Sequence, residues 1–230
     1  MFSLDAKVID DVLATTVPSF QLTSRETANL GFGFIFYGLT RAIRPRHVVV
    51  VGSKAGFAPV CFALGIRDNE GFGIDVVDCE STTMTDTSKT GLLTFIDPSL
   101  SIHRGDAGHS FGIGTWDEPE TTAAIFANHG VGAIVRHYKM TSADYIADSP
   151  PAPPIDILYI DGDHSYEGVS HDLTSFAPLL SETAIILAHD VHPGLPDSDG
   201  YRAFADLPGT FEKIRLPFTP GLAIIRQCDR

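Results

Sequence analysis

Two short motifs combine carboxylates with imidazoles, and each directly follows an apolar run of strand length. The first is Ile-Asp161-Gly-Asp-His164, and the second is His189-Asp190. Carboxylates that lie close together repel one another unless a cation or a histidine compensates their charge. One imidazole with two carboxylates also suits Mg²⁺ or Mn²⁺. If the two runs are neighbouring parallel strands, the motifs predict a divalent-metal site. The alternative is that the acids only hold the two histidines in place.

A glycine-bearing turn follows the β-branched run Val48–Val51 and has the sequence Gly52-Ser53-Lys-Ala-Gly56. Such a turn lets the backbone approach a ligand closely, and the helix behind it offers unpaired N–H groups. Asp78 comes 26 residues after Gly52, at the end of the next expected strand, where a carboxylate can accept hydrogen bonds from ribose hydroxyls. This pairing serves NAD as well as S-adenosylmethionine (SAM). The alternative is an ordinary turn, with Asp78 capping a helix.

The elements that must position these residues alternate between strands and helices. Strands are predicted at 48–51, 73–78, 132–136, 155–160 and 184–188, helices at 57–64 and 166–180, and a closing hairpin at 211–216 and 222–226. This pattern predicts an α/β fold with a Rossmann-like doubly wound sheet. We expect seven strands, mostly parallel, with a C-terminal antiparallel hairpin.

The chain is expected to form a single domain over residues 1–230, with N-terminal helices in 1–45. The first helix is predicted at 5–16, and Thr23 with Glu26 resembles a capping box that opens the second helix, which ends before Pro45. Residues 81–118 do not fit the alternation because they are rich in polar residues and glycine. They are expected to form an inserted lid or substrate wall; the alternative is a solvated surface loop.

Composition narrows the classes of partner. The 230 residues carry a formal net charge of −13, which disfavours nucleic acids and anionic membranes as partners. Three cysteines without close spacing argue against a disulfide scaffold or a thiolate zinc site, and no apolar run is long enough to span a membrane. The N-terminus lacks the features of a signal peptide, so a cytoplasmic location is expected. A homo-oligomer is compatible with these features.

The ordered motifs resemble those of class I SAM-dependent methyltransferases. The stretch Ile160–Glu167 (Ile-Asp-Gly-Asp-His-Ser-Tyr-Glu) and the later pair His189-Asp190 are most similar to a group of bacterial small-molecule O-methyltransferases. The likeness to the cation-dependent catechol and caffeoyl-coenzyme A O-methyltransferases is more distant. The resemblance spans residues 23–192 and is most specific in the Ile160–Glu167 stretch.

The resemblance implies that residues at the ends of the first three expected strands bind SAM, namely Gly52, Ser53, Gly56, Asp78, Thr141 and Ser142. The first three would line the methionine part, Asp78 would hold the ribose, and the last two would contact adenine. Asp161 is expected beside the cofactor and as the first metal ligand, with His189 and Asp190 as the other two. His164 stands where the cation-dependent relatives place a general base, and an imidazole can take that role near neutral pH.

Two departures from the family pattern are visible. Val50 replaces an acid that commonly precedes the first glycine, and Lys54 adds a positive charge that must point away from the SAM sulfonium. The expected activity is methyl transfer from SAM to a hydroxyl of a small molecule, a secondary metabolite by family analogy, with Mg²⁺ positioning the acceptor. The alternatives are a metal-independent N-methyltransferase, a nicotinamide-dependent oxidoreductase, a catalytically inactive SAM-fold subunit, and a metal-dependent hydrolase.

Overall fold

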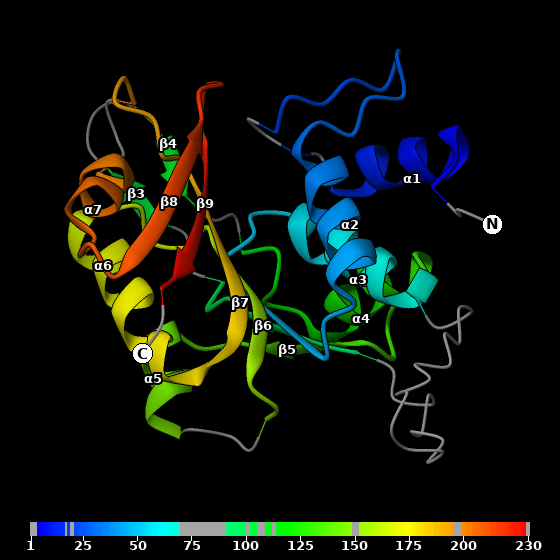
Figure 1. Ribbon diagram of the computed structural model, residues 1–230. Helices are drawn as coiled ribbons and strands as arrows, with labels where there is room; N and C mark the ends of the chain where they lie inside the picture. Colours follow the sequence, from blue (N-terminus) through cyan, green and yellow to red (C-terminus); the bar gives the residue numbers. More distant parts are fainter. Residues whose placement is uncertain are drawn as a thin grey trace, which may run out of the picture.

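Seven strands form one mixed sheet, with helices packed on both of its faces (Figure 1). The computed structural model describes residues 4–16, 18, 21–69, 91–99, 102–104, 109–111, 114–148, 152–195 and 199–228. The strand order across the sheet is β5-β2-β1-β6-β7-β9-β8. The strands are β1 (His47–Val51), β2 (Leu92–Ile96), β5 (Val135–Tyr138), β6 (Ile155–Ile160), β7 (Leu180–His189), β8 (Phe211–Leu216) and β9 (Leu222–Gln227).

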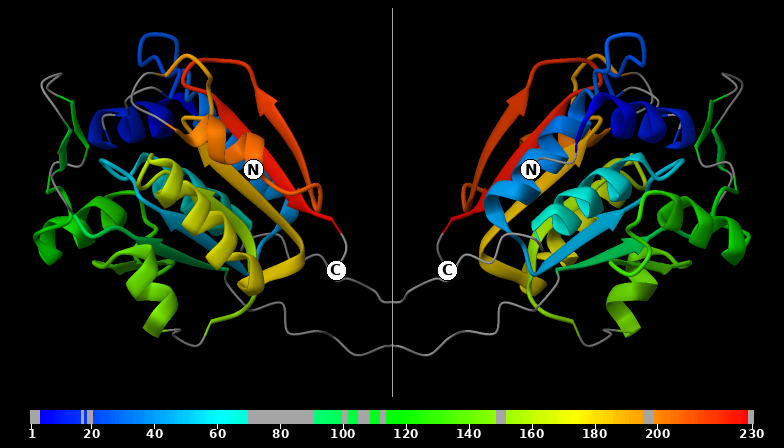
Figure 2. Two further views of the ribbon diagram at one scale, coloured as in Figure 1. Left: turned by 90° about the vertical axis from the view of Figure 1, so that its left-hand side faces the viewer. Right: turned by 90° about the vertical axis from the view of Figure 1, so that its right-hand side faces the viewer.

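The first five strands of that order run parallel, and in the C-terminal hairpin β9 runs in the opposite direction to them. β1 pairs with β2 and β6 in parallel register, whereas β9 pairs antiparallel with β7 and β8. The predicted fold class is therefore confirmed. Figure 2 shows that β5 and the β8–β9 hairpin lie at opposite edges of the sheet. A separate two-stranded antiparallel ribbon joins β3 (Ile102–Arg104) to β4 (His109–Phe111).

The helices divide into two layers, and each layer has its own apolar core. One layer holds α1 (Ala6–Thr16), α2 (Phe32–Ile43), α3 (Phe57–Asn69) and α4 (Pro119–Asn128), and the other holds α5 (Ser142–Asp148), α6 (Tyr166–Ser175) and α7 (Gly200–Asp206) (Figure 1). Each residue of β1 and β6 is buried. Because helices cover both faces, these strands can be mainly apolar on both sides, which is how the sequence revealed them. No helix among the described residues is long and apolar enough to cross a membrane.

The partner of β1 differs from the sequence expectation. β2 (Leu92–Ile96) lies beside β1, although the sequence analysis placed these residues inside an inserted segment at 81–118. That assignment is wrong for residues 92–96, which form a central strand with four buried side chains. Thr94 interrupts the apolar run, but its hydroxyl contacts His47 Nε2 at 2.9 Å, so the polar group is satisfied inside the sheet. The predicted strand at 73–78 lies outside the described residues.

Two helix boundaries also need correction. The proposed capping box at Thr23 and Glu26 does not begin a helix: Ser24 and Asn29 instead exchange backbone hydrogen bonds across a tight turn, and α2 starts at Phe32. The helix predicted at 166–180 stops at Ser175, because a 3₁₀ turn leads into the long strand β7. Both boundaries were missed because sequence patterns mark helix ends imprecisely, whereas local backbone hydrogen bonds decide them. The predicted end of α2 before Pro45 is confirmed.

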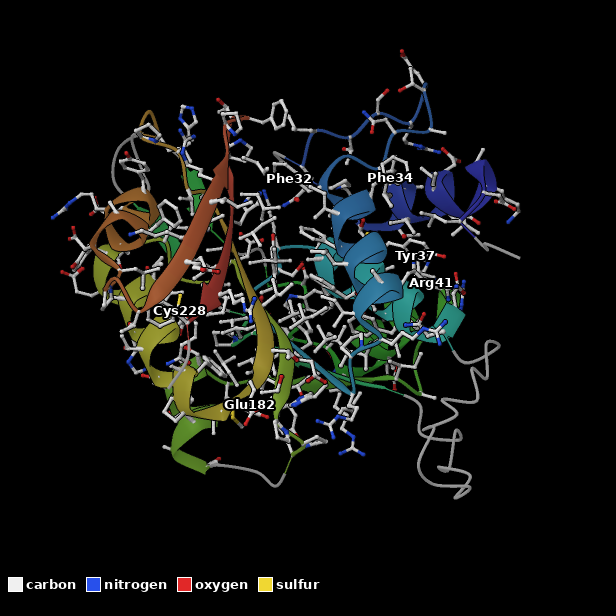
Figure 3. All side chains as sticks on the ribbon, in the orientation of Figure 1. Phe32, Phe34, Tyr37, Arg41, Glu182 and Cys228 are labelled. Atoms are coloured by element: carbon white, nitrogen blue, oxygen red, sulfur yellow. The ribbon has the colours of Figure 1, made fainter. Side chains whose placement is uncertain are left out.

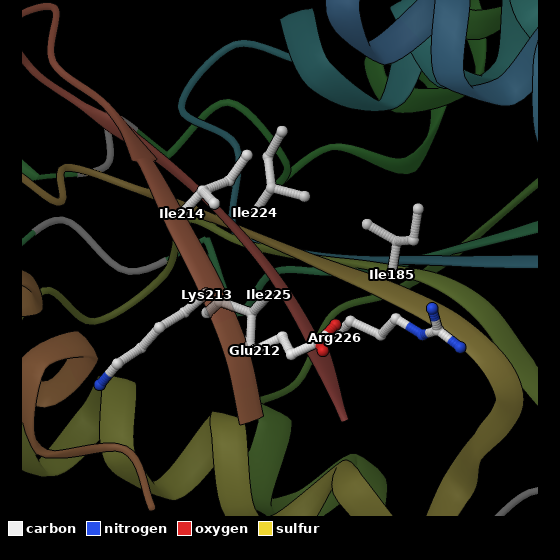
Figure 4. Close-up of a pocket in the computed structure, with 7 residues that line it drawn as sticks. All are labelled: Ile185, Glu212, Lys213, Ile214, Ile224, Ile225 and Arg226. Carbon is white, nitrogen blue, oxygen red and sulfur yellow. The ribbon is translucent and has the colours of Figure 1, made fainter. Parts of the chain in front are cut away.

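A shallow hollow lies over β7 and the C-terminal hairpin. It is lined by Ile185, Glu212, Lys213, Ile214, Ile224, Ile225 and Arg226 (Figure 4). Ile214 is 59% exposed at this edge of the sheet. The hollow has a mainly aliphatic wall. The expectation of a homo-oligomer stays a prediction.

A buried carboxyl group links α5 to α6 and gives a test of the packing. Asp172 is 3% exposed and accepts a hydrogen bond from the Ser142 hydroxyl at 2.6 Å. Burial raises the pKa of Asp172 from 3.8 to about 6, against the smaller opposing effect of that hydrogen bond. The folded chain therefore holds this proton more tightly than the unfolded chain. The resulting stabilisation is present below pH ~4 and is lost as the pH rises to ~6.

We predict that Asp172→Asn, which keeps an oxygen for Ser142, flattens this part of the stability profile. The two pKa values correspond to a loss of about 3 kcal/mol of unfolding free energy in the wild type. Urea unfolding of both proteins from pH 4 to pH 7.5 measures the difference. Asp148→Asn, an exposed change on α5, is the control and should follow the wild type. Parallel profiles for wild type and Asp172→Asn would show that Asp172 does not titrate in this way.

Candidate functional site

The two predicted acidic motifs meet at the carboxyl ends of β6 and β7. His189 Nδ1 lies 3.1 Å from Asp161 Oδ1 and 2.9 Å from Asp190 Oδ1, and His164 Nδ1 lies 3.2 Å from Asp190 Oδ2. Ile160 of β6 pairs in parallel with Ala188 of β7. Because β6 ends directly before Asp161 and β7 ends at His189, this pairing brings the two motifs side by side. All four side chains are at most 18% exposed. The sequence prediction that they cluster is thus confirmed.

The charged groups of the cluster shift one another's pKa values. Burial by itself lowers the pKa of His189, but the negative charges of Asp161 and Asp190 raise it to about 10. Burial raises the pKa of Asp190, and the stronger combined effect of His189 and His164 lowers it. A proton on His189 therefore balances the two carboxylates when nothing else does. A bound cation would compete with that proton, because a ligating imidazole must be neutral.

Three neighbouring side chains, Tyr159, Gln21 and Phe32, contact the cluster. The Tyr159 hydroxyl donates to Asp161 Oδ2 at 3.2 Å, and burial together with the Asp161 charge raises the pKa of Tyr159 well above its usual value. Gln21 is 6% exposed, and its amide nitrogen lies 3.1 Å from His189 Nε2. The Phe32 ring stands edge-on to the His189 ring, at 5.9 Å between centroids. Phe32 is buried, unlike Phe34 on the same helix (Figure 3).

The sequence analysis did not single out Tyr159 or Gln21. Tyr159 belongs to a mainly apolar, buried strand, so only its hydroxyl hinted at a polar neighbour. Gln21 comes from the segment before α2, far from β7 in the chain, and no local pattern marks it. Gln21 shows that the N-terminal segment, and not only the strand ends, shapes the site.

Asp190 adopts an unusual backbone conformation. Its φ is 58°, in the left-handed region that costs a non-glycine residue on the order of 1–3 kcal/mol. Aspartate tolerates this region better than most residues. The bend follows the last residue of β7 and brings the carboxylate of Asp190 between His164 and His189. Strained residues of this kind cluster at functional sites, which is consistent with a role for Asp190 beyond packing.

The glycine turn lies against the acidic cluster. Gly52 has a φ of 75°, and a Cβ at this position would collide with the carbonyl oxygen of Asp161. The Asp161 N–H donates to the Val51 carbonyl at 2.8 Å, which continues the β1–β6 pairing up to the site. Ser53 is buried, whereas Lys54 is exposed, as expected for a cation that must avoid a sulfonium. The turn and the cluster therefore form one continuous surface at the strand ends.

Asp97 is the acidic residue that ends the strand next to β1. Its carboxylate accepts the Ser53 N–H at 3.0 Å and the Ser99 N–H at 2.8 Å. Burial raises the pKa of Asp97, and the nearby Asp161 charge adds to the increase. In topology this is the position that the sequence analysis gave to Asp78. Asp78 lies outside the described residues, so its assignment stays a prediction. The signal for Asp97 was present in the run Leu-Leu-Thr-Phe-Ile-Asp.

Thr141 and Ser142 follow β5 and begin α5, where their hydroxyls have local partners. Thr141 Oγ1 donates to Asp144 Oδ2 at 2.6 Å and accepts the Asp144 N–H at 3.1 Å. The Ser142 hydroxyl donates to Asp172. Their predicted contact with adenine stays a prediction, and neither side chain joins the acidic cluster.

The donor set fits a divalent cation. Asp161, His164 and Asp190 each offer one ligand atom within 4.8 Å of the others. His189 Nδ1 is buried and close to both carboxylates, yet among the described residues it has no well-aligned hydrogen bond. Neighbouring ligands of an octahedral ion with bonds of 2.0–2.1 Å are about 3 Å apart, which is close to these separations. Two carboxylates with either imidazole therefore provide a plausible set of ligand types and spacings.

Comparison with known proteins gives one curated relative and several solved structures. An uncharacterized protein of Sinorhizobium fredii, y4gI, is 22% identical over 187 residues, which cover 81% of this chain and 18% of that protein. The chain thus spans less than a fifth of the length of this relative.

The solved structures share the fold at low sequence identity. The O-methyltransferase of Bacillus cereus, in complex with S-adenosylhomocysteine (SAH), is 11% identical, has a TM-score of 0.63, and matches 96% of this chain and 90% of its own. The O-methyltransferase TomG of Streptomyces achromogenes, in complex with SAM, is 14% identical with a TM-score of 0.57, and the match covers 97% of this chain and 89% of TomG. The SAH-bound methyltransferase PaMTH1 of Podospora anserina is 16% identical with a TM-score of 0.59, and the match covers 96% of this chain and 88% of PaMTH1.

A family described as a methyltransferase domain matches residues 49–191, from the glycine turn to the end of the acidic cluster. The match covers more than half of the 230 residues and includes both motifs that carry the candidate site. The chain belongs to this methyltransferase-domain family.

Proposed function

We propose that this protein transfers the methyl group of SAM to a hydroxyl group of a small molecule, with a divalent cation at the acidic cluster. One observation carries the proposal: the glycine turn after β1 is in contact with Asp161 of the cluster. A cofactor on the turn would present its reactive methyl group close to the carboxylates and imidazoles. Ligands of open α/β sheets bind at this end of the strands.

The cofactor half of the proposal rests on the turn and on Asp97. Gly52 and Gly56 have positive φ values of 75° and 85°, so the turn takes a shape that other residues rarely adopt. Asp97 lies beside this turn and accepts the Ser53 N–H, and each of its oxygens has a second lone pair. We assign Asp97 to the ribose hydroxyls. The SAM and SAH complexes of the structural relatives support SAM as the cofactor.

The metal half rests on the chemistry of the cluster. Asp161, Asp190 and His189 would hold Mg²⁺ or Mn²⁺, as the resemblance of the sequence implies, and the ion would lower the pKa of a bound acceptor hydroxyl. Asp190 also contacts His164 at 3.2 Å, which orients the imidazole as a carboxylate does in other acid–base pairs. We assign His164 as the base that removes the hydroxyl proton.

The reaction is an in-line displacement at the methyl carbon. The acceptor oxygen forms the new C–O bond with its lone pair while the C–S bond breaks, and the sulfonium becomes the neutral thioether of SAH. The acceptor proton passes to His164. Alignment of the three reacting atoms can supply ~7–11 kcal/mol of the barrier, so the rigid turn and the buried cluster would contribute mainly by positioning.

The acceptor is proposed only as a class. The formal net charge of −13 disfavours a nucleic-acid substrate. TomG is described as involved in tomaymycin synthesis, which supports a secondary metabolite as the acceptor here. A metal-independent N-methyltransferase is the main alternative, since an amine needs no ion to become nucleophilic. A metal-dependent hydrolase would use the same cluster but has no use for the glycine turn.

We predict micromolar SAM binding by isothermal titration, and Asp97→Asn should weaken it about tenfold or more, because a charge-assisted hydrogen bond is lost. Asp156→Asn is the matched control. Asp156 also accepts a backbone N–H, from Arg46 at 2.7 Å, but lies at the opposite end of the sheet. It should leave SAM affinity unchanged. Wild-type protein that does not bind SAM would refute the proposed activity, and equal affinity in Asp97→Asn would refute only the role of Asp97.

We predict different effects from the two histidines. His189→Ala should weaken Mn²⁺ binding to the SAM complex, whereas His164→Ala should keep Mn²⁺ affinity and lower kcat about 10²- to 10⁴-fold. Titration calorimetry measures the first effect, and SAH release with a panel of phenols, sugars and macrolides measures the second. If His164→Ala loses the ion instead, His164 is a ligand and not the base. Full activity in EDTA would favour the metal-independent alternative.

A further inference from the structure

We propose that Trp116 is a positioning residue for the SAM-binding turn, although it comes from the segment between β4 and α4. This inference rests on the proposed function and adds to it a residue that fixes the cofactor site from outside β1. Trp116 is 2% exposed and is the only tryptophan in the sequence. Its indole N–H donates to the Ser53 carbonyl at 2.9 Å.

The indole hydrogen bond completes the backbone pairing of Ser53. The Ser53 N–H donates to Asp97 Oδ2 at 3.0 Å, and the Ser53 carbonyl accepts the indole N–H of Trp116. Trp116 is tied to the same acid through Ser99: the Trp116 backbone N–H donates to the Ser99 hydroxyl at 3.0 Å, and the Ser99 N–H donates to Asp97 at 2.8 Å. Ser53, Asp97, Ser99 and Trp116 therefore form a closed ring of hydrogen bonds at the turn.

The indole ring also fills the space above the second glycine. A Cβ at Gly56 would lie 2.9 Å from Trp116 Cη2, so the ring packs directly on the glycine backbone. Thr115 adds a second clamp, because its hydroxyl donates to the Lys54 carbonyl at 2.9 Å. Three residues of the turn (Ser53, Lys54 and Gly56) are thus in contact with two neighbouring residues, Thr115 and Trp116.

The aromatic rings packed around Trp116 explain why it can hold the turn in place. Its ring stacks on Phe126 of α4 at 5.9 Å with an interplanar angle of 7°, and stands edge-on to Phe95 of β2 at 4.8 Å. His137 of β5 lies tilted at 5.6 Å. A ring held by a helix and two strands has little freedom to shift, so it fixes the Ser53 carbonyl and restricts how the turn can open.

A clamp of this kind predicts a specific effect on cofactor affinity. Without it, part of the binding energy of SAM would be spent on ordering the turn. Trp116→Phe keeps an aromatic ring but removes the N–H and the atom nearest Gly56. Phe126→Leu is the comparison variant, because it loosens the packing around the ring but keeps the indole N–H and the atom nearest Gly56.

The experiment measures SAM affinity by isothermal titration for wild type, Trp116→Phe, Phe126→Leu and the milder Thr115→Val, with Tm for each protein. We expect Trp116→Phe to raise Kd for SAM about five- to tenfold, as for the loss of one hydrogen bond and its contacts. Thr115→Val should raise Kd in the same direction by less. Phe126→Leu should lower Tm and raise Kd by clearly less than Trp116→Phe, because the indole N–H is still present. The tryptophan emission of wild type and Phe126→Leu should shift when SAM is added.

The outcomes separate this inference from the proposed function. If wild type binds SAM and both Trp116→Phe and Thr115→Val bind it equally well, Trp116 has only a packing role and the inference is wrong. The same holds if Kd rises as much in Phe126→Leu as in Trp116→Phe, since general destabilisation would then explain the change. If the wild-type protein binds no SAM, the proposed function fails and this inference fails with it.

Discussion

The close approach of Gly52 to Asp161 is the constraint on which the site depends. No side chain fits between the two backbones, and the Asp161 N–H is bound to the strand that ends at the glycine turn. This contact fixes the separation between the part of the site that would bind the cofactor and the part that would bind the acceptor. Methyl transfer is sensitive to such a separation, because the reacting atoms must be aligned. The two apolar cores support the contact by burying β1 and β6 completely.

Charge compensation is the second requirement. Asp161 and Asp190 share a small buried volume, and His189 lies between them with a pKa raised to about 10. A buried pair of carboxylates is costly without a positive partner. In this cluster either a proton or a metal ion can provide the positive charge, so ion binding is expected to be linked to proton release. Tyr159 and Gln21 confine the cluster on the side of the N-terminal helices.

Sequence reasoning found the parts of the site that are encoded locally. The strand at 155–160 was predicted with its observed bounds, because a mainly apolar run that follows a proline-rich segment and precedes an acid has few other interpretations. The clustering of Asp161 with His189 and Asp190 followed from parallel strand pairing alone. Residues whose role depends on distant partners were missed: Asp97 follows a strand interrupted by Thr94, and Gln21 precedes α2 in a segment without a pattern. The false capping box at Thr23 failed for a different reason, since the local backbone pairing of Ser24 with Asn29 replaces the expected helix start.

The most direct test of the account is a crystal structure with SAH and Mn²⁺, collected at a wavelength that gives the anomalous signal of manganese. The account predicts SAH over the Gly52–Gly56 turn with its ribose against Asp97, and one manganese peak between Asp161 and Asp190. The sulfur of SAH should face the ion across the Gly52–Asp161 contact. SAH bound away from the turn, or a manganese peak away from these two carboxylates, would contradict the central claim that the two motifs form one active site.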